Sequence, residues 1–307
     1  MIASSIASET LIKKERKLER IIQASFEGES QHVSQTIIDL LLQCNISLPS
    51  LRHGGLKRLG EVLNSETPII IASVQCPDYS YIKTTEESAK SYEFTFETLG
   101  NDVGLIAQQI LTIAPLFHNF FSDLSIQHKF SFAIADYEGL NPSTLKKVNL
   151  SKHEFQHRCR QSLQKFTDCL ELFPDTYSAS LITELESVVW DDLVYHEASR
   201  IIKETKGSSR RSISSIYQTA ANASKALYTK WFELDENSDS YYERLLDLTK
   251  ADAINYLSIA LAFSKAHQNS PMIILSCDRP SMAFFYELMG EVHSHPTCVL
   301  HLNKSMY

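Results

Sequence analysis

The sequence predicts an α/β protein with a Rossmann-like, mostly parallel sheet, flanking helices and an N-terminal helical extension. Three short apolar runs of the kind that forms buried strands support this prediction, at residues 69–72, 129–135 and 272–276. Polar residues follow each run, and helical patterns separate the runs along the chain. Strands that alternate with helices favour a parallel sheet, in which each crossover connection is right-handed.

The composition is that of an ordinary globular protein. With 307 residues, 43% of them hydrophobic, the chain is long enough to bury a sizeable core. No run approaches 18 apolar residues and the N-terminus soon turns charged, so we expect no membrane span and no signal peptide. Six scattered cysteines without CxxC spacing indicate reduced thiols and a cytoplasmic protein. The net charge of −8 argues against general nucleic-acid binding but allows a local basic face.

The chain divides into two predicted parts. Residues 1–60 read as a helical cap, with helical patterns at 10–27 and 31–44, and residues 61–307 read as one Rossmann-like catalytic domain. Within the second part we expect a polar, aromatic loop around Tyr92 and Phe96, then an apolar helix to about residue 121 that Pro115 kinks or splits. Further helices are expected at 151–170, 180–206, 208–232 and 240–267, and a last short strand at 298–302.

Chemically active side chains follow the predicted strands. Ser73 and Cys76 come after the first run, Asp136 and Glu138 after the second, and Asp278 after the third. The carboxyl ends of parallel strands meet at one edge of the sheet, and open α/β sheets bind their ligands there. A Ser or Cys nucleophile beside carboxylates suits acyl transfer. The structural alternatives are a core strand that ends in a Cys-Pro turn and, for Asp136, a strand-end cap.

The segment HEFQH at 153–157 matches the HExxH pattern of zinc hydrolases. In such a site His153 and His157 would bind zinc and Glu154 would act as general base. The neighbouring residues are polar, however, and Glu154 lies three positions after Ser151, which is the spacing of a helix capping box. We therefore expect no metal here, and no cofactor elsewhere.

The helix predicted at 151–170 also carries a basic face. It is formed by Lys152, His157, Arg158, Arg160 and Lys165. Basic side chains gathered on one helix of an acidic protein suit contacts with nucleic-acid phosphates. The alternative is an ordinary solvated helix face.

Four stretches resemble the cyclodipeptide synthases, Rossmann-fold relatives of class I tRNA synthetase catalytic domains. The run IIIAS at 69–73, with Tyr79 and Ser80 after it, resembles the family's first strand and its serine nucleophile. The helix 151–170 resembles the family's tRNA-contacting helix. The segment that leads to Tyr256 resembles its catalytic Tyr-x-x-x-Glu helix, and DRP at 278–280 resembles its Asp-x-Pro turn.

The resemblance implies a role for each site residue. Ser73 would accept the aminoacyl group, Tyr256 would position it and Asp278 would bind a substrate amine. Substrate contacts would come from the side chains that follow the first two strands, Cys76, Tyr79 and Asp136. The chain departs from the family at Ala260, where the catalytic glutamate is expected, so Glu138 or Asp136 would have to replace that group.

The sequence thus predicts an aminoacyl transferase that resembles cyclodipeptide synthases and forms a peptide bond through an aminoacyl-serine intermediate. Its partners would be aminoacyl-tRNA and a small product derived from amino acids, and we expect no association with a membrane. Three alternatives stay open: an enzyme like the isocyanide synthases that acts on an amino acid, a zinc hydrolase that uses HExxH, and a non-enzymatic binding protein on the same fold.

Overall fold

A computed structural model describes most of the central and C-terminal chain. The described residues are 31–44, 46, 55–75, 79–82, 93–96, 105–137, 145, 150–170, 177–185, 194–204, 213–268, 270–276 and 295–302. They fall into two compact units. The first is drawn from Met1–Leu185, Ser270–Cys277 and Pro296–Tyr307, and the second from Glu186–Asn269 and Asp278–His295. The division predicted from the sequence at residue 60 stays a prediction.

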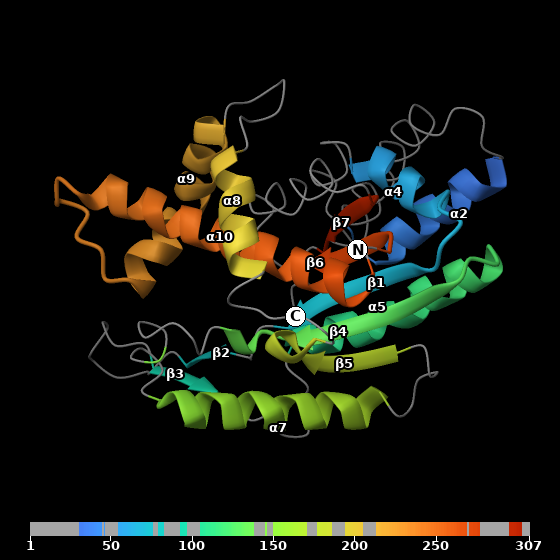
Figure 1. Cartoon of the computed structure of the whole chain (residues 1–307), viewed down its shortest axis with the longest axis horizontal. Helices are drawn as coiled ribbons and strands as arrows, with labels where there is room; N and C mark the ends of the chain where they lie inside the picture. Colours follow the sequence, from blue (N-terminus) through green and yellow to red (C-terminus); the bar gives the residue numbers. More distant parts are fainter. Residues whose placement is uncertain are drawn as a thin grey trace, which may run out of the picture. The chain divides into compact units, whose positions relative to one another are not determined.

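The first unit is built on a five-stranded sheet in the order β5-β4-β1-β6-β7 (Figure 1). Its strands are β1 (Ile69–Gln75), β4 (His128–Ile134), β5 (Tyr177–Leu181), β6 (Met272–Ser276) and β7 (Thr297–His301). All four neighbouring pairs are parallel. The central strand β1 has β4 and β5 on one side and β6 and β7 on the other. This arrangement confirms the Rossmann-like fold, and it places the topological switch point between β1 and β6.

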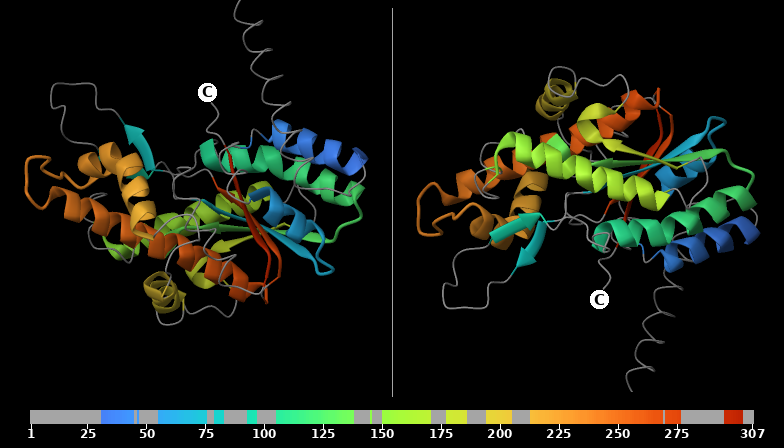
Figure 2. Two further views of the ribbon diagram at one scale, coloured as in Figure 1. Left: turned by 90° about the horizontal axis from the view of Figure 1, so that it is seen from above. Right: turned by 90° about the horizontal axis from the view of Figure 1, so that it is seen from below.

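One face of the sheet packs against the helices α2 (Gln31–Gln43), α4 (Leu56–Leu63) and α5 (Leu105–Asp123). In Figure 2, α2 lies beside α5 in both views. Alternate residues of each strand point to one face, so Ile69 and Ile71 of β1 join the same core cluster as Phe130 and Phe132 of β4. The α5 helix is continuous and contains Pro115, so the proline does not split it, and the alternative of a kink stays a prediction.

The helix α7 (Lys152–Leu170) packs against β5 and β4 with the apolar stripe that its sequence predicts. Phe155, Cys159, Phe166 and Leu170 are buried. The ring of Phe166 meets that of Phe132 edge-on, with ring centroids 5.5 Å apart. These contacts fix which residues of α7 face solvent, and those residues include most of the predicted basic face.

Several elements differ from the sequence prediction. The helix expected from residue 180 does not begin there, because residues 177–184 form β5 and the short 3-10 helix η3 (Ile182–Glu184). Helix α8 (His196–Glu204) lies within the expected range. The loop expected through Phe94 instead contains an antiparallel pair, β2 (Tyr79–Ile82) with β3 (Glu93–Phe96). The residues that lead toward β1 form α4.

The second unit contains α8, α9 (Ile213–Trp231) and α10 (Tyr241–Ala266). The last two lie close to the helices predicted at 208–232 and 240–267. The buried Tyr228 of α9 donates a short hydrogen bond to the carboxylate of Asp252 in α10. Near the C-terminal end of α10, Lys265 contacts Glu197 of α8. These polar contacts join α10 to both α8 and α9.

Two general features of the described residues bear on the sequence predictions. Cys44, Cys159 and Cys298 are buried in the thiol form, which fits the expected reduced state. Within the described ranges, no helix is both long and apolar enough to span a membrane.

Candidate functional site

Ser73 lies inside β1 and not after its end. The strand runs three residues beyond the apolar stretch that predicted it, because Ser73, Val74 and Gln75 continue the pairing with β4. The expectation that Ser73 follows the strand is therefore wrong, although its role stays a prediction. A serine fits in this strand because its hydroxyl donates a hydrogen bond of 3.0 Å to the backbone carbonyl of Leu275 in β6.

Ser73 marks the point where the two central strands stop pairing. The register of β1 with β6 ends at Ser73 opposite Leu275, whereas that of β1 with β4 continues to Gln75 opposite Ile134. The side chain of Ser73 is 1% exposed. It therefore lies at the base of the switch point, the position at which open α/β sheets bind ligands.

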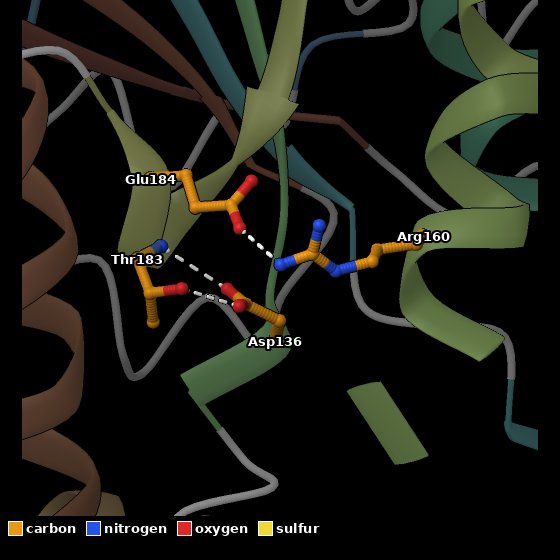
Figure 3. Close-up of polar contacts among 4 residues, drawn as sticks. All are labelled: Asp136, Arg160, Thr183 and Glu184. Carbon is orange, nitrogen blue, oxygen red and sulfur yellow. Dashed lines mark hydrogen bonds and ion pairs between the residues drawn. The ribbon is translucent and has the colours of Figure 1, made fainter. Parts of the chain in front are cut away.

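Asp136 lies just after the end of β4 and is 4% exposed. Its carboxylate accepts a 3.1 Å hydrogen bond from the backbone N–H of Thr183 and a short one from the hydroxyl of Thr183 (Figure 3). Burial raises the pKa of Asp136, the bonds from Thr183 oppose that rise, and the charge of Glu184 adds a little to it. These contacts match the strand-end cap that the sequence left open, while substrate binding by Asp136 stays a prediction.

Glu184, the residue after Thr183, connects this strand end to the basic helix. Its Oε1 lies 2.5 Å from Nη2 of Arg160 on α7, and the four side chains of this group appear together in Figure 3. Arg160 therefore has an anionic partner from another element. From the sequence, Glu184 is a candidate only as a third zinc ligand for the HExxH segment. No pattern pointed to Thr183 or to the pair of Arg160 with Glu184, because both residues fall in a stretch that reads as helix.

The other residues of the predicted basic face differ in exposure. Lys152 and His157 are exposed, whereas Arg158 is half-buried. Lys165 lies within α7, but its side chain is outside the described residues. Because successive helix residues are 100° apart, Arg158 and Arg160 point to opposite flanks of α7.

The HExxH segment forms a capped helix start. The carboxylate of Glu154 accepts hydrogen bonds from the backbone N–H of Ser151 at 2.8 Å and its hydroxyl at 2.6 Å, and the N–H of Glu154 donates to Ser151 Oγ at 3.2 Å. This confirms the capping box, and the bonds from Ser151 lower the pKa of Glu154. His153 and His157 are exposed. No group of three or more His, Cys, Asp or Glu side chains suited to a metal occurs among the described residues.

The remaining predicted site residues lie in α10 or fall wholly or partly outside the described residues. Tyr256 is half-buried in α10, and Ala260 one turn later is fully buried, so the position of the missing glutamate lies in a packed part of the helix. Cys76, Glu138 and Asp278 lie outside the described residues, and only the backbone of Tyr79 is described, in β2.

Polar residues that the sequence analysis did not single out end the last two strands. Ser276 of β6 is paired in register with His301 of β7, and both are buried. The apolar run around His301 predicted the strand but gave no sign that the imidazole is enclosed.

Comparisons with known proteins show only remote structural similarity. No protein-family model and no curated protein matches the sequence. A solved structure of a cyclodipeptide synthase from Candidatus Glomeribacter gigasporarum, bound to Phe-tRNAPhe, resembles the chain with a TM-score of 0.42 and 15% sequence identity. The match covers 80% of this chain and 91% of that one. The assignment of a Rossmann-like fold therefore rests on the strand order of this chain itself.

Proposed function

We propose that this chain is an aminoacyl transferase that resembles the cyclodipeptide synthases and takes aminoacyl groups from tRNA. The observation that carries the proposal is the place of Ser73, the last residue of β1 to pair with β6. A hydroxyl nucleophile on a rigid central strand, at the edge where such sheets bind ligands, has the fixed geometry that covalent catalysis needs. The sequence resemblance at 69–73 points to the same serine.

In the proposed reaction, Oγ of Ser73 attacks the ester carbonyl carbon of an aminoacyl-tRNA. The bond from that carbon to the ribose oxygen breaks, and the ribose oxygen takes the proton that the serine loses. The amine of a second aminoacyl group then attacks the acyl-serine, which forms the peptide bond and returns a proton to Oγ. The Ser73 hydroxyl must first leave the carbonyl of Leu275, since its proton is bonded there.

The remaining roles follow the sequence resemblance. Tyr256 would position the aminoacyl group, Asp278 would bind an amine, and Cys76 with Tyr79 would contact the substrate. Asp136 or Glu138 would exchange the proton that the missing glutamate handles elsewhere in the family. The raised pKa of Asp136 suits that task, because a carboxyl group that titrates closer to neutral pH exchanges protons more readily.

The exposed basic side chains of α7 are the proposed contact for tRNA phosphates. Lys152 and His157 face solvent, and the side chain of Arg160 is 64% exposed. Phosphate contacts of this kind position a nucleic acid without reading its sequence.

A non-enzymatic binding protein on the same fold is the second candidate. Two observations favour it: Ser73 is almost completely buried, and Ala260 replaces the glutamate in a packed stretch of α10. A chain that kept the fold and lost the chemistry would still bind a ligand at the switch point.

Intact-protein mass spectrometry after incubation with charged tRNA tests the proposal. We expect a covalent aminoacyl adduct in the parent and in Cys76→Ala, and none in Ser73→Ala. An adduct that survives in Ser73→Ala but is lost in Cys76→Ala would assign the chemistry to the thiol. No adduct in any form, together with no cyclic dipeptide in cells that express the chain, would favour the binding protein.

A further inference from the structure

The ion pair between Arg160 and Glu184 joins two elements that are separate in the chain. The two residues are 24 positions apart, and their side chains are 64% and 48% exposed. Several other ion pairs among the described residues are local pairs within one helix, such as Arg200 with Glu204 on α8 and Lys57 with Glu61 on α4. Arg160 is thus a basic group of α7 whose anionic partner comes from outside the helix.

Glu184 is held in place without help from Arg160. The preceding residue, Thr183, is bound to the buried carboxylate of Asp136 through both its N–H and its hydroxyl (Figure 3). Ile182 and Leu185 on either side are buried, which fixes the short helix η3 against the sheet. The backbone of Glu184 is therefore fixed within reach of Arg160, so its carboxylate remains available to the arginine when another anion approaches.

We propose that Glu184 is a built-in competitor for the anion that Arg160 binds, so that a phosphate chain docking on α7 must displace the Glu184 carboxylate. The proposal rests on the proposed function, in which α7 receives tRNA phosphates. It assigns to Glu184 the role of setting how strongly the basic face of α7 binds phosphates. An anion with several adjacent phosphates can displace Glu184 while contacting neighbouring groups, whereas a single small anion has to compete for Arg160 alone.

The expected effect is modest, because exposed ion pairs are weak and salt-screened. Removing the competing charge by Glu184→Gln should tighten the binding of uncharged tRNA by about two- to fivefold at low salt. It should also steepen the dependence of log K on log salt by about one, since one more phosphate contact then releases a counterion without a compensating carboxylate.

A double-mutant cycle separates this effect from general electrostatics. The variants are Glu184→Gln, Arg160→Gln and the double variant, and each is compared by the binding of uncharged tRNA and of inorganic polyphosphate. We expect the gain from Glu184→Gln to vanish when Arg160 is already Gln. Asp168→Asn is the matched control, because it removes one negative charge from α7 itself. The Asp168 carboxylate accepts a hydrogen bond from Gln164, so this variant should give a smaller gain in affinity.

The cycle has outcomes that would overturn the proposal. A gain that persists in the Arg160→Gln background, or one that Asp168→Asn matches, would show that Glu184 acts only through net charge. If polyphosphate binds and the effect of Glu184→Gln depends on Arg160, but tRNA does not bind, then Glu184 is a competitor for the anion and tRNA is not the partner. No binding of either probe by any variant would refute both. Thermal unfolding of each variant, which should match the parent, confirms that the fold is kept.

Discussion

His118 and His128 share a hydrogen bond between Nδ1 of the first ring and Nε2 of the second, with a distance of 2.9 Å. The other nitrogen of His128, Nδ1, lies 3.0 Å from the carbonyl oxygen of Ile126. A carbonyl only accepts, so Nδ1 of His128 carries the proton, Nε2 is the acceptor and His118 is the donor. Protonation of His128 would put a hydrogen on Nε2 as well, so the bond would persist only if His118 changed tautomer and became the acceptor.

This pair should make stability depend on pH. Burial lowers the pKa of His128 below its ordinary value of 6.5, while the Ile126 carbonyl opposes the effect and His118 adds to it. In the unfolded chain His128 binds a proton near pH 6.5, whereas the folded protein resists it. The stability that comes from keeping His128 neutral is therefore fully present above that pH. It is lost as the pH falls toward the lower pKa of His128 in the folded protein. The urea concentration at the unfolding midpoint should therefore decrease as the pH is lowered from about 7.5 to about 5.5.

The matched variants identify the histidine responsible. His128→Gln should flatten the change in urea midpoint over this range, and His153→Gln, which alters an exposed residue of α7, should leave it as in the parent. Equal pH dependence in the parent and in His128→Gln would show that the pair does not set it.

The hydroxyl of Ser73 should make a limited contribution to stability. Ser73→Ala removes one buried hydrogen bond, for which we expect a loss of about 1 kcal/mol in the free energy of unfolding. Ser178 is a more exposed comparison, since its hydroxyl also donates a hydrogen bond, of 2.9 Å, to a neighbouring strand, at the carbonyl of Phe130. Chemical denaturation of both Ala variants checks this. A loss of several kcal/mol in Ser73→Ala alone would mean that any lost activity reflects unfolding.

Reversing the two arginines of α7 should weaken tRNA binding. Arg158→Glu combined with Arg160→Glu should lower the affinity for tRNA. The plot of log K against log salt should become less steep, by about one unit of slope for each phosphate that the variant no longer binds. Neither residue lies on the buried stripe, so the fold should persist. The control reverses Arg200 and Lys203 on α8, which changes the net charge equally. Equal tRNA affinity of the α7 variant and the parent would leave α7 as a solvated face.

The HExxH segment should hold no stoichiometric zinc. The reason is structural, since Glu154 is engaged by Ser151 and both histidines are exposed to solvent. Elemental analysis of the purified protein checks this prediction. About one zinc per chain, lost in His153→Ala, would contradict it and would support the zinc hydrolase.

The strands with strong apolar runs could be predicted from the sequence, and the small or polar ones could not. The observed β6 matches its prediction at 272–276 and β4 is one residue displaced. The sequence YSASL of β5 has little apolar character, and it forms a strand because it pairs with β4 and because Tyr177 stacks on Phe130 at 4.2 Å. That stabilisation is tertiary and leaves no local pattern.

The same reason limited prediction of the candidate site. The capping box of Ser151 and Glu154 follows a local spacing rule and was predicted correctly. The contacts of Asp136 with Thr183 and of Arg160 with Glu184 join segments that are 47 and 24 residues apart. Only the packing of β4, β5 and α7 brings them together.

The strand order has a consequence for synthesis on the ribosome. The strands β1, β4 and β5 are complete by Leu181, but β6, which covers the other side of β1, begins only at Met272. At typical translation rates of about 5–20 residues per second, the intervening stretch of about 90 residues leaves one edge of β1 uncovered for roughly 5–20 s. An open edge with the sequence Ile-Ile-Ile-Ala invites pairing with another chain. The nascent protein is therefore most prone to aggregate in this interval, when a chaperone that shields strand edges would raise its yield.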